Sequence, residues 1–178
     1  MRVRSQGVCS GRSGLAGWYP TRLLDLGPQD QPSAVSTMFR VVERDDVSPG
    51  ERYTTLSHRW DTMQTARLTV TTMPTYRSGV SISTLSRTFQ DAIAVTRRLK
   101  LRYIWIDSLC IVQDGDDGRD WAIESTQMDK VYLNSFVNIA ASAGSGREGL
   151  FVERDTACYT TLKATATHTH SHVSFRQL

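Results

Sequence analysis

The amino-acid sequence predicts an α/β fold in which a mostly parallel sheet is flanked by helices. Two β-prone runs, at residues 52–60 and 102–107, are separated by a segment whose apolar residues recur at helical spacing. A second helical segment follows the later run, and residues 136–142 then supply a third β-prone run. Strands that alternate with helices favour parallel pairing and right-handed crossover connections.

The composition indicates one domain of an intracellular protein. The chain has 178 residues, which is enough for a single hydrophobic core. Its formal net charge is +3, and because the basic residues are scattered among acidic ones, nucleic acid is not an expected partner. No apolar run is long enough to span a bilayer, and Cys9, Cys110 and Cys158 lie too far apart to suggest a disulfide framework or a zinc site. We therefore expect a cytoplasmic protein.

The N-terminal part of the chain leads into the first core strand. Residues 1–20 are rich in Gly, Ser and Arg and are expected to form a disordered arm. The runs at 21–26 and 38–43 are short and β-prone, with a turn-forming segment between them. Residues 52–60 alternate in part and are the first core strand, whereas the Thr-rich residues 61–80 form a long connection.

Two helices are predicted around the strand at 102–107. The first begins at Thr88, which is expected to form a capping box with Asp91. The second is expected to be capped by Asp120. Its apolar side is marked by Trp121, Met128, Val131 and Tyr132. Residues 156–178 are rich in Thr, Ala and His, which is typical of a low-complexity tail or of a poorly packed extra strand.

The expected ligand site is the sheet edge at which the carboxyl ends of the parallel strands meet. This arrangement places Trp60 and Asp61 near Asp107 and Ser108, with residues 142–144 close by. Asp107 directly follows an apolar run, where a carboxylate is costly to bury unless it has a hydrogen-bonding partner or a functional role. It is either a functional group at the ligand edge or a structural acceptor for the backbone amides of the next turn.

Further side chains near this edge are candidates for chemistry, each with a structural alternative. Cys110 is a nucleophile only if His58 lies close, and its apolar neighbours favour a buried structural thiol. Ser57 and His58 are adjacent on a strand and project to opposite faces, which excludes a direct Ser–His pair. Glu124 lies one turn into the second helix, where an acid/base role competes with that of a solvent-facing residue, and spacing alone favours the latter.

Two patterns resemble metal sites without predicting one. The loop at 113–120 is rich in aspartate but lacks the terminal bidentate glutamate of an EF-hand. His168, His170 and His172 would share one face of a strand, yet no carboxylate or thiol stands at a fixed spacing from them. We therefore expect no bound metal.

Six segments, taken in order, resemble the heterokaryon incompatibility (HET) domain of filamentous fungi. They are RLLDL, YTTLSHRW, TFQDAIAVTRRL, RYIWIDSLCIVQD, DWAIESTQMDKVY and NIAASAGSGREGLF. The most specific combination is WIDSLCIVQD followed by DW and then by a Met and a Tyr. The resemblance sets the expected domain at residues 21–155. The chain departs from the family at Asp61, where the family usually has Gly, so a Cβ occupies a turn that a ligand would approach.

The resemblance implies a role in fungal non-self recognition, in which HET domains induce programmed cell death after incompatible fusion. It also implies a distant likeness to the TIR fold, a flavodoxin-like three-layer sandwich. Some TIR domains cleave NAD with a helix-borne glutamate, so Glu124 becomes a candidate catalytic residue and NAD a candidate substrate. The other candidates are Asp107 and Cys110 for catalysis, and Ser57, His58, Trp60 and Gln113 for ligand binding.

Several classes of function remain open at this stage. An enzyme would consume a nucleotide such as NAD, whereas a non-catalytic scaffold would act through its partners. Such partners would be other incompatibility proteins, NLR-type proteins or a second copy of the chain. A third alternative, a Cys–His hydrolase, requires Cys110 to be reactive.

Overall fold

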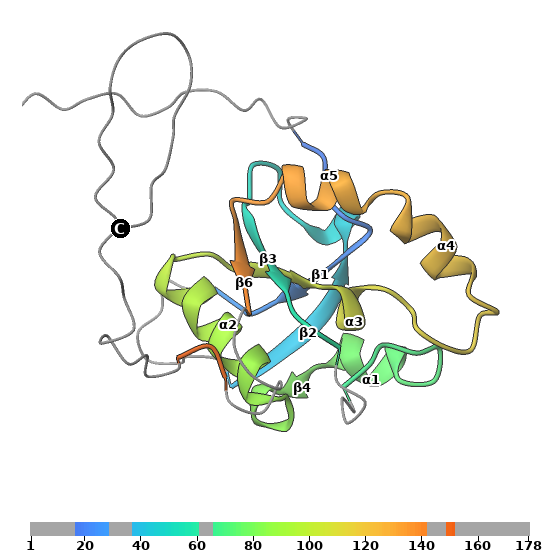
Figure 1. Ribbon diagram of the computed structural model, residues 1–178, viewed down its shortest axis with the longest axis horizontal. Coiled ribbons are helices and arrows are strands. Elements are labelled where there is room, and N and C mark those ends of the chain that lie inside the picture. The colour runs from blue at the N-terminus through green and yellow to red at the C-terminus, as the bar shows by residue number, and fades with distance from the viewer. Residues whose placement is uncertain (1–16, 29–36, 61–65, 142–148, 152–178) are drawn as a thin grey trace, which may run out of the picture.

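The computed structural model describes residues 17–28, 37–60, 66–141 and 149–151, and its strands form one six-stranded sheet (Figure 1). The strands are β1 (Arg22–Asp25), β2 (Met38–Glu43), β3 (Tyr53–Ser57), β4 (Val80–Ser81), β5 (Tyr103–Ile106) and β6 (Val137–Ala140). The helices are α1 (Met73–Ser78), α2 (Arg87–Arg98), α3 (Asp107–Cys110), α4 (Arg119–Ser125) and α5 (Met128–Leu133). The α/β class is therefore confirmed.

The sheet is mixed, and the prediction of a mostly parallel sheet is wrong. The strand order is β4-β2-β1-β5-β3-β6. β3 pairs in parallel with β5 and β6, whereas β1 with β2, β1 with β5, and β2 with β4 are antiparallel. The runs predicted to lead into the core instead extend the sheet beyond β5. No helix separates β1 from β2 in the predicted order, and consecutive strands without a crossover helix favour antiparallel pairing.

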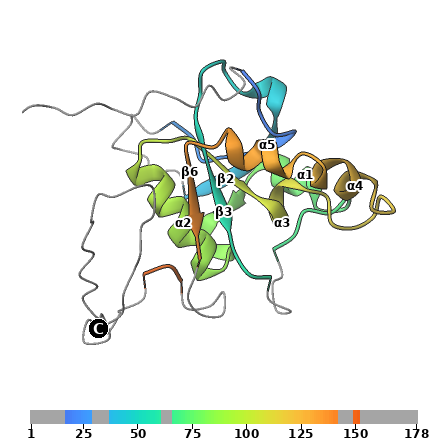
Figure 2. The same ribbon diagram turned by 45° about the horizontal axis from the view of Figure 1, so that its top comes forward.

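The parallel strands β5, β3 and β6 lie between two helices. Adjacent residues of a strand point to opposite faces of the sheet, and on β3 they contact different helices. The hydroxyls of Thr54 and Thr96 are 2.7 Å apart, which joins β3 to α2. The hydroxyl of Tyr53 donates a 2.7 Å hydrogen bond to the carbonyl of Val131, which joins β3 to α5. Figure 2 shows α2 and α5 on different sides of β3.

Helix α2 forms where its apolar spacing predicts, but a different residue caps it. Ser86 precedes the helix, and its hydroxyl accepts a 3.4 Å hydrogen bond from the amide of Phe89. Thr88 lies inside the helix and is buried, so the predicted capping box is wrong. Asp91 pairs with Arg87 instead, at 3.2 Å. The apolar face, with Phe89 only 1% exposed, packs into the core. Burial of one such large side chain stabilises the fold by about 1.5–3 kcal/mol.

The second predicted helix is split into α4 and α5. Gly118, with a φ of 73°, takes the N-cap position that was expected for Asp120. The carboxylate of Asp120 instead accepts a 2.7 Å hydrogen bond from the amide of Val112. Because the helix is interrupted before α5, its two halves do not share one apolar side. Val131 is buried, but Trp121 is 56% exposed, so the prediction for Trp121 is wrong.

Some predictions fall on residues that the structure does not describe. These are the arm at residues 1–16, Asp61, residues 142–144, the tail at 156–178, and with it His168, His170 and His172. Among the described residues, no helix is long and apolar enough to cross a membrane. The same residues contain no group of three or more His, Cys, Asp or Glu side chains that could hold a metal ion.

Candidate functional site

Three of the predicted site residues meet at the carboxyl ends of β3 and β5. We call His58, Trp60 and Asp107 the edge site. The indole Nε1 of Trp60 donates a 2.8 Å hydrogen bond to Oδ2 of Asp107, which confirms the expected proximity of these two residues. The amide of Ser108 donates a 2.7 Å hydrogen bond to Oδ1 of Asp107. The carboxylate is therefore held in one orientation by two donors, one of which is a backbone amide of the next turn, as the structural reading of Asp107 expects.

His58 is the most unusual group of the edge site because it is buried without a hydrogen bond. Its side chain is only 4% exposed, and Nδ1 lies 3.7 Å from Oδ1 of Asp107, beyond hydrogen-bond distance. The imidazole makes an edge-to-face contact with the ring of Phe89 of α2, with the ring centroids 4.9 Å apart. Neither ring nitrogen has a hydrogen-bond partner among the described residues. Leaving a buried polar group unpaired costs about 1–3 kcal/mol, which a bound water or ligand can recover.

The arrangement of His58 and Asp107 is suited to proton transfer. A small approach of the imidazole would let Nδ1–H donate to the carboxylate, which would fix the tautomer with a free lone pair on Nε2. An imidazole oriented by a carboxylate is the usual general base of hydrolytic sites. Trp60 is 44% exposed and adds an aromatic surface beside this pair, with its ring stacked at 16° to that of His58.

Two other predicted residues position the backbone around the edge site. The amide nitrogen Nε2 of Gln113 donates to the carbonyls of Asp107, at 3.2 Å, and of Ile111, at 3.0 Å. The hydroxyl of Ser57 donates a 3.1 Å hydrogen bond to Oδ1 of Asn138 on β6. By alternation along β3, Ser57 lies on the face that Tyr53 presents to α5, whereas His58 contacts α2, so their side chains lie on opposite faces, as predicted.

Cys110 is a buried thiol. The residue is 1% exposed, and burial raises the pKa of its thiol to about 12. Its carbonyl accepts a 2.7 Å hydrogen bond from Nε of Arg22. A thiol that stays protonated at neutral pH cannot act as a nucleophile, so these observations favour the structural alternative for Cys110.

Glu124 belongs to a buried ionic group. The residue is 4% exposed, and its charge acts on Arg22 of β1, which also forms an ion pair with Asp120. Burial alone would lower the pKa of Arg22, but the hydrogen bond to Asp120 and the nearby carboxylates raise it above its usual value. The solvent-facing alternative for Glu124 is therefore wrong.

Arg22 was missed by the sequence analysis, although a signal for it exists. It is a lone arginine in an apolar β-prone run, and a buried arginine needs carboxylate partners. Asp120 and Glu124 are four residues apart, the spacing at which two side chains share one face of a helix. Phe89 and Asn138 were also missed, because their contacts depend on how α2 and β6 pack.

One comparison with known proteins gives a match. The family model described as heterokaryon incompatibility protein (HET) matches residues 53–177, more than half of the chain. No curated protein and no solved structure matches the chain. The matched region begins at the first residue of β3 and contains the whole edge site and Glu124. β1 and β2 precede it, although β1 pairs with β5 of the matched region.

Proposed function

Because this chain belongs to the heterokaryon incompatibility protein (HET) family and so functions in fungal heterokaryon incompatibility, we propose that it promotes cell death by cleaving NAD at the edge site. The observation that carries the proposal is the buried imidazole of His58, whose ring nitrogens have no partner among the described residues. A buried, unpaired titratable group beside an oriented carboxylate is typical of functional sites.

The order of the parallel strands supports the proposed likeness to the flavodoxin and TIR folds. β3 lies between β5, which follows it in the chain, and β6, which comes last. The two later parallel strands are thus added on opposite sides of β3, which makes β3 a switch point in the strand order. In open α/β sheets, ligands bind outside the carboxyl ends of the strands at such a switch point. His58 and Trp60 directly follow β3. The antiparallel strands β1, β2 and β4 are the part of this sheet that a flavodoxin-like order lacks.

The proposed reaction is hydrolysis of the bond between nicotinamide and ribose. Asp107 accepts a hydrogen bond from Nδ1–H of His58 and stays ionised, and Nε2 of His58 removes a proton from a water molecule. The water oxygen forms a bond to the anomeric carbon of the ribose, while the bond to nicotinamide breaks and its electron pair leaves with neutral nicotinamide. The exposed face of Trp60 supplies stacking for a base. Glu124 is retained as a second candidate carboxylate, acting from beside Arg22.

The test is nicotinamide release from NAD by the purified protein. We expect His58→Gln and Asp107→Asn each to lower the rate by at least ~100-fold, the usual contribution of a general base. Glu124→Gln would lower it comparably only if the carboxylate on α4 is the reactive one. Asp129→Asn, on the exposed side of α5, is the control and should leave the rate unchanged. Circular dichroism must show that every variant is folded. An unchanged rate in both His58→Gln and Asp107→Asn would refute the edge site as the reactive centre.

A non-catalytic scaffold is the second candidate function, and exposed apolar side chains favour it. Trp121 and Ile123 on α4 are 56% and 59% exposed, and Leu133 on α5 is 55% exposed. Exposed apolar side chains of this size mark contact surfaces when they are grouped. In this alternative the chain acts in the cytoplasm through a second copy or an NLR-type partner. Cell death that is abolished by Ile123→Asp but unaffected by His58→Gln would favour the scaffold over the enzyme.

We also propose that the domain starts near residue 21, before the region that the family model matches. β1 forms an integral part of the sheet, because Leu24 pairs with Ile104 of β5. Arg22 of β1 also forms the ion pair with Asp120 of α4. A chain that begins at residue 50 should therefore be insoluble or unfolded by circular dichroism, whereas one that begins at residue 17 should fold.

A further inference from the structure

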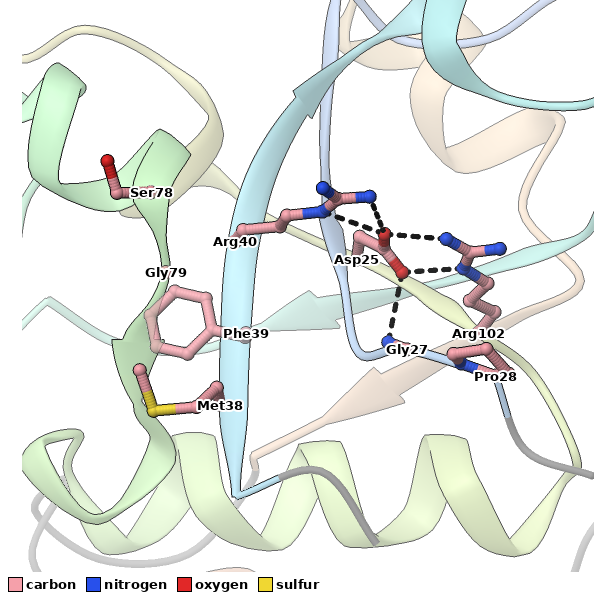
Figure 3. Close-up of a pocket in the computed structure, with 9 residues that line it drawn as sticks. All are labelled: Asp25, Gly27, Pro28, Met38, Phe39, Arg40, Ser78, Gly79 and Arg102. Carbon is pink, nitrogen blue, oxygen red and sulfur yellow. Dashed lines mark hydrogen bonds and ion pairs between the residues drawn. The ribbon is translucent and has the colours of Figure 1, made fainter. Parts of the chain in front are cut away.

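A cavity lies at the end of the sheet opposite the edge site. Arg102 directly precedes β5 and Asp107 directly follows it, so the two ends are separated by about 16 Å of extended strand. The cavity has a volume of about 300 Å³. Its charged lining consists of Asp25, Arg40 and Arg102, and its apolar lining of Pro28, Met38 and Phe39 (Figure 3).

One carboxylate in this cavity is shared by two arginines. Nε and Nη2 of Arg102 donate to Oδ1 and Oδ2 of Asp25, at 2.6 Å and 2.8 Å. Nε and Nη2 of Arg40 both donate to Oδ2 of Asp25, at 3.1 Å and 3.0 Å. The amide of Gly27 adds a 2.9 Å hydrogen bond to Oδ1. Figure 3 shows both guanidinium groups converging on this carboxylate, that of Arg40 from β2 and that of Arg102 from the residue before β5.

This arrangement leaves hydrogen-bond donors without an acceptor among the described residues, and it carries a net positive charge. The two oxygens of a carboxylate accept about four hydrogen bonds, so Asp25 has no capacity beyond those it already makes. Each guanidinium has a second terminal nitrogen, which forms no hydrogen bond within the described residues. Two guanidinium groups and one carboxylate carry a net charge of one positive unit. Glu51 also acts on Arg102, but it does not line the cavity.

The exposure of the two arginines makes these donors accessible. The side chain of Arg40 is 54% exposed and that of Arg102 is 32% exposed, whereas the side chain of Asp25 is only 3% exposed. The negative group thus lies at the base of the cavity, and the positive groups lie between it and solvent. The remaining terminal nitrogens, one from each arginine, can donate together to the oxygens of one carboxylate or phosphate ester.

We propose that this cavity binds a small organic anion, whose carboxylate or phosphate group contacts Arg40 and Arg102 and whose apolar body packs on Pro28 and Met38. The cavity is at the small end of the range for ligand sites, which fits a single ring and excludes a dinucleotide. The site is separate from the edge site and does not depend on NAD cleavage.

The proposal is tested with isothermal titration of the full chain by three probes. Phenyl phosphate offers both the anion and the apolar body, inorganic phosphate offers only the anion, and benzyl alcohol offers only the apolar body. We expect phenyl phosphate to bind most tightly, inorganic phosphate to bind at least ~5-fold more weakly, and benzyl alcohol not to bind, because each part contributes. Benzoate in place of phenyl phosphate distinguishes a carboxylate site from a phosphate site.

Two variants assign the binding to the cavity. Arg40→Gln should weaken the binding of phenyl phosphate by at least ~10-fold, because one of the two charged guanidinium donors is lost. Arg77→Gln is the matched control, since the side chain of Arg77 is also 54% exposed and pairs with Glu43 outside the cavity lining. Met38→Ser should lower the affinity for phenyl phosphate but not for inorganic phosphate. Equal weakening by Arg40→Gln and Arg77→Gln, or no binding of any anion at about 10 mM, would overturn the proposal.

Discussion

The indole Nε1 of Trp60 donates a 2.8 Å hydrogen bond to Oδ2 of Asp107 and so joins the chain after β3 to the chain after β5. The other oxygen of Asp107 accepts a hydrogen bond from the amide of Ser108 and lies 3.7 Å from Nδ1 of His58. One carboxylate therefore contacts groups from two parallel strand ends. This contact fixes the relative position of the aromatic surface and the imidazole at the edge of the sheet.

The first prediction concerns the coupling between Trp60 and Asp107. Asp107→Asn should lower the free energy of unfolding by about 1–3 kcal/mol, because hydrogen bonds to a charged group are lost. In a Trp60→Phe background the same change should cost less, by about 1 kcal/mol, since the indole donor is already absent. Urea denaturation of the two single variants and the double variant measures this coupling. Strict additivity of the two changes would show that the hydrogen bond contributes nothing to stability.

The second prediction concerns the ion pair that holds α4 against β1. The side chains of Arg22 and Asp120 are 7% and 19% exposed. Arg22→Met should lower the free energy of unfolding by about 3–5 kcal/mol, because it leaves Asp120 and Glu124 without their buried cation. Urea denaturation monitored by circular dichroism measures the change.

A surface ion pair of the same chain provides the control for this measurement. Arg119 and Asp117 are 3.8 Å apart, and their side chains are 81% and 90% exposed. Arg119→Met should change the free energy of unfolding by less than about 0.5 kcal/mol, because exposed ion pairs contribute little. A loss of similar size in Arg22→Met and Arg119→Met would contradict a structural role for the buried pair.

The local elements of this fold are readable from the sequence, but their pairing is not. The bounds of β2 at 38–43 agree with the predicted run, and the helical spacing after Thr88 locates α2. Both patterns depend on residues close together in the chain. The antiparallel addition of β1 beside β5 depends on Leu24 meeting Ile104, a contact between distant residues that leaves no periodic signal. The break between α4 and α5 likewise has no glycine or proline to mark it.

The sequence predicts those contacts of the candidate site that depend only on which residues lie at the ends of parallel strands. Trp60 and Asp107 stand at the ends of two strands that the sequence predicts to be parallel, so their contact could be expected. The burial of His58 could not, because it depends on Phe89 of α2. The role of Glu124 beside Arg22 requires β1 to lie next to β5, which is the part of the topology that the sequence did not reveal.

The third prediction concerns the pH dependence of stability at Asp25. Burial would raise the pKa of Asp25, but hydrogen bonds from Arg102, Gly27 and Arg40 outweigh it and hold the pKa below its ordinary value of 3.8. A carboxyl group with a lowered pKa stabilises the folded state above its ordinary pKa, and this contribution is lost as the pH falls through the folded-state pKa. Asp25→Asn should therefore cost about 1.5–3 kcal/mol at neutral pH.

The test compares urea denaturation of the wild type and Asp25→Asn across pH. The difference in the free energy of unfolding should be constant between about pH 5 and pH 7 and should shrink as the pH falls below 3.8. Asp45→Asn, an exposed substitution in the same half of the chain, should show no such trend. A difference that is independent of pH down to about pH 2 would mean that the arginine partners do not lower the pKa of Asp25 in the folded state.

The last prediction concerns the reactivity of Cys110, on which a Cys–His hydrolase would depend. With a pKa of about 12, the thiol is ionised in roughly one molecule in 10,000 at about pH 8, and it is buried at 1% exposure. In a Cys9→Ser/Cys158→Ser variant, a thiol-directed reagent should label Cys110 only as fast as the protein unfolds, and completely in urea. Asp117→Cys in the same background supplies an exposed control thiol, because the side chain of Asp117 is 90% exposed. Rapid labelling of Cys110 in the folded protein, at the rate of the control, would restore the hydrolase as a candidate and place the nucleophile next to Asp107.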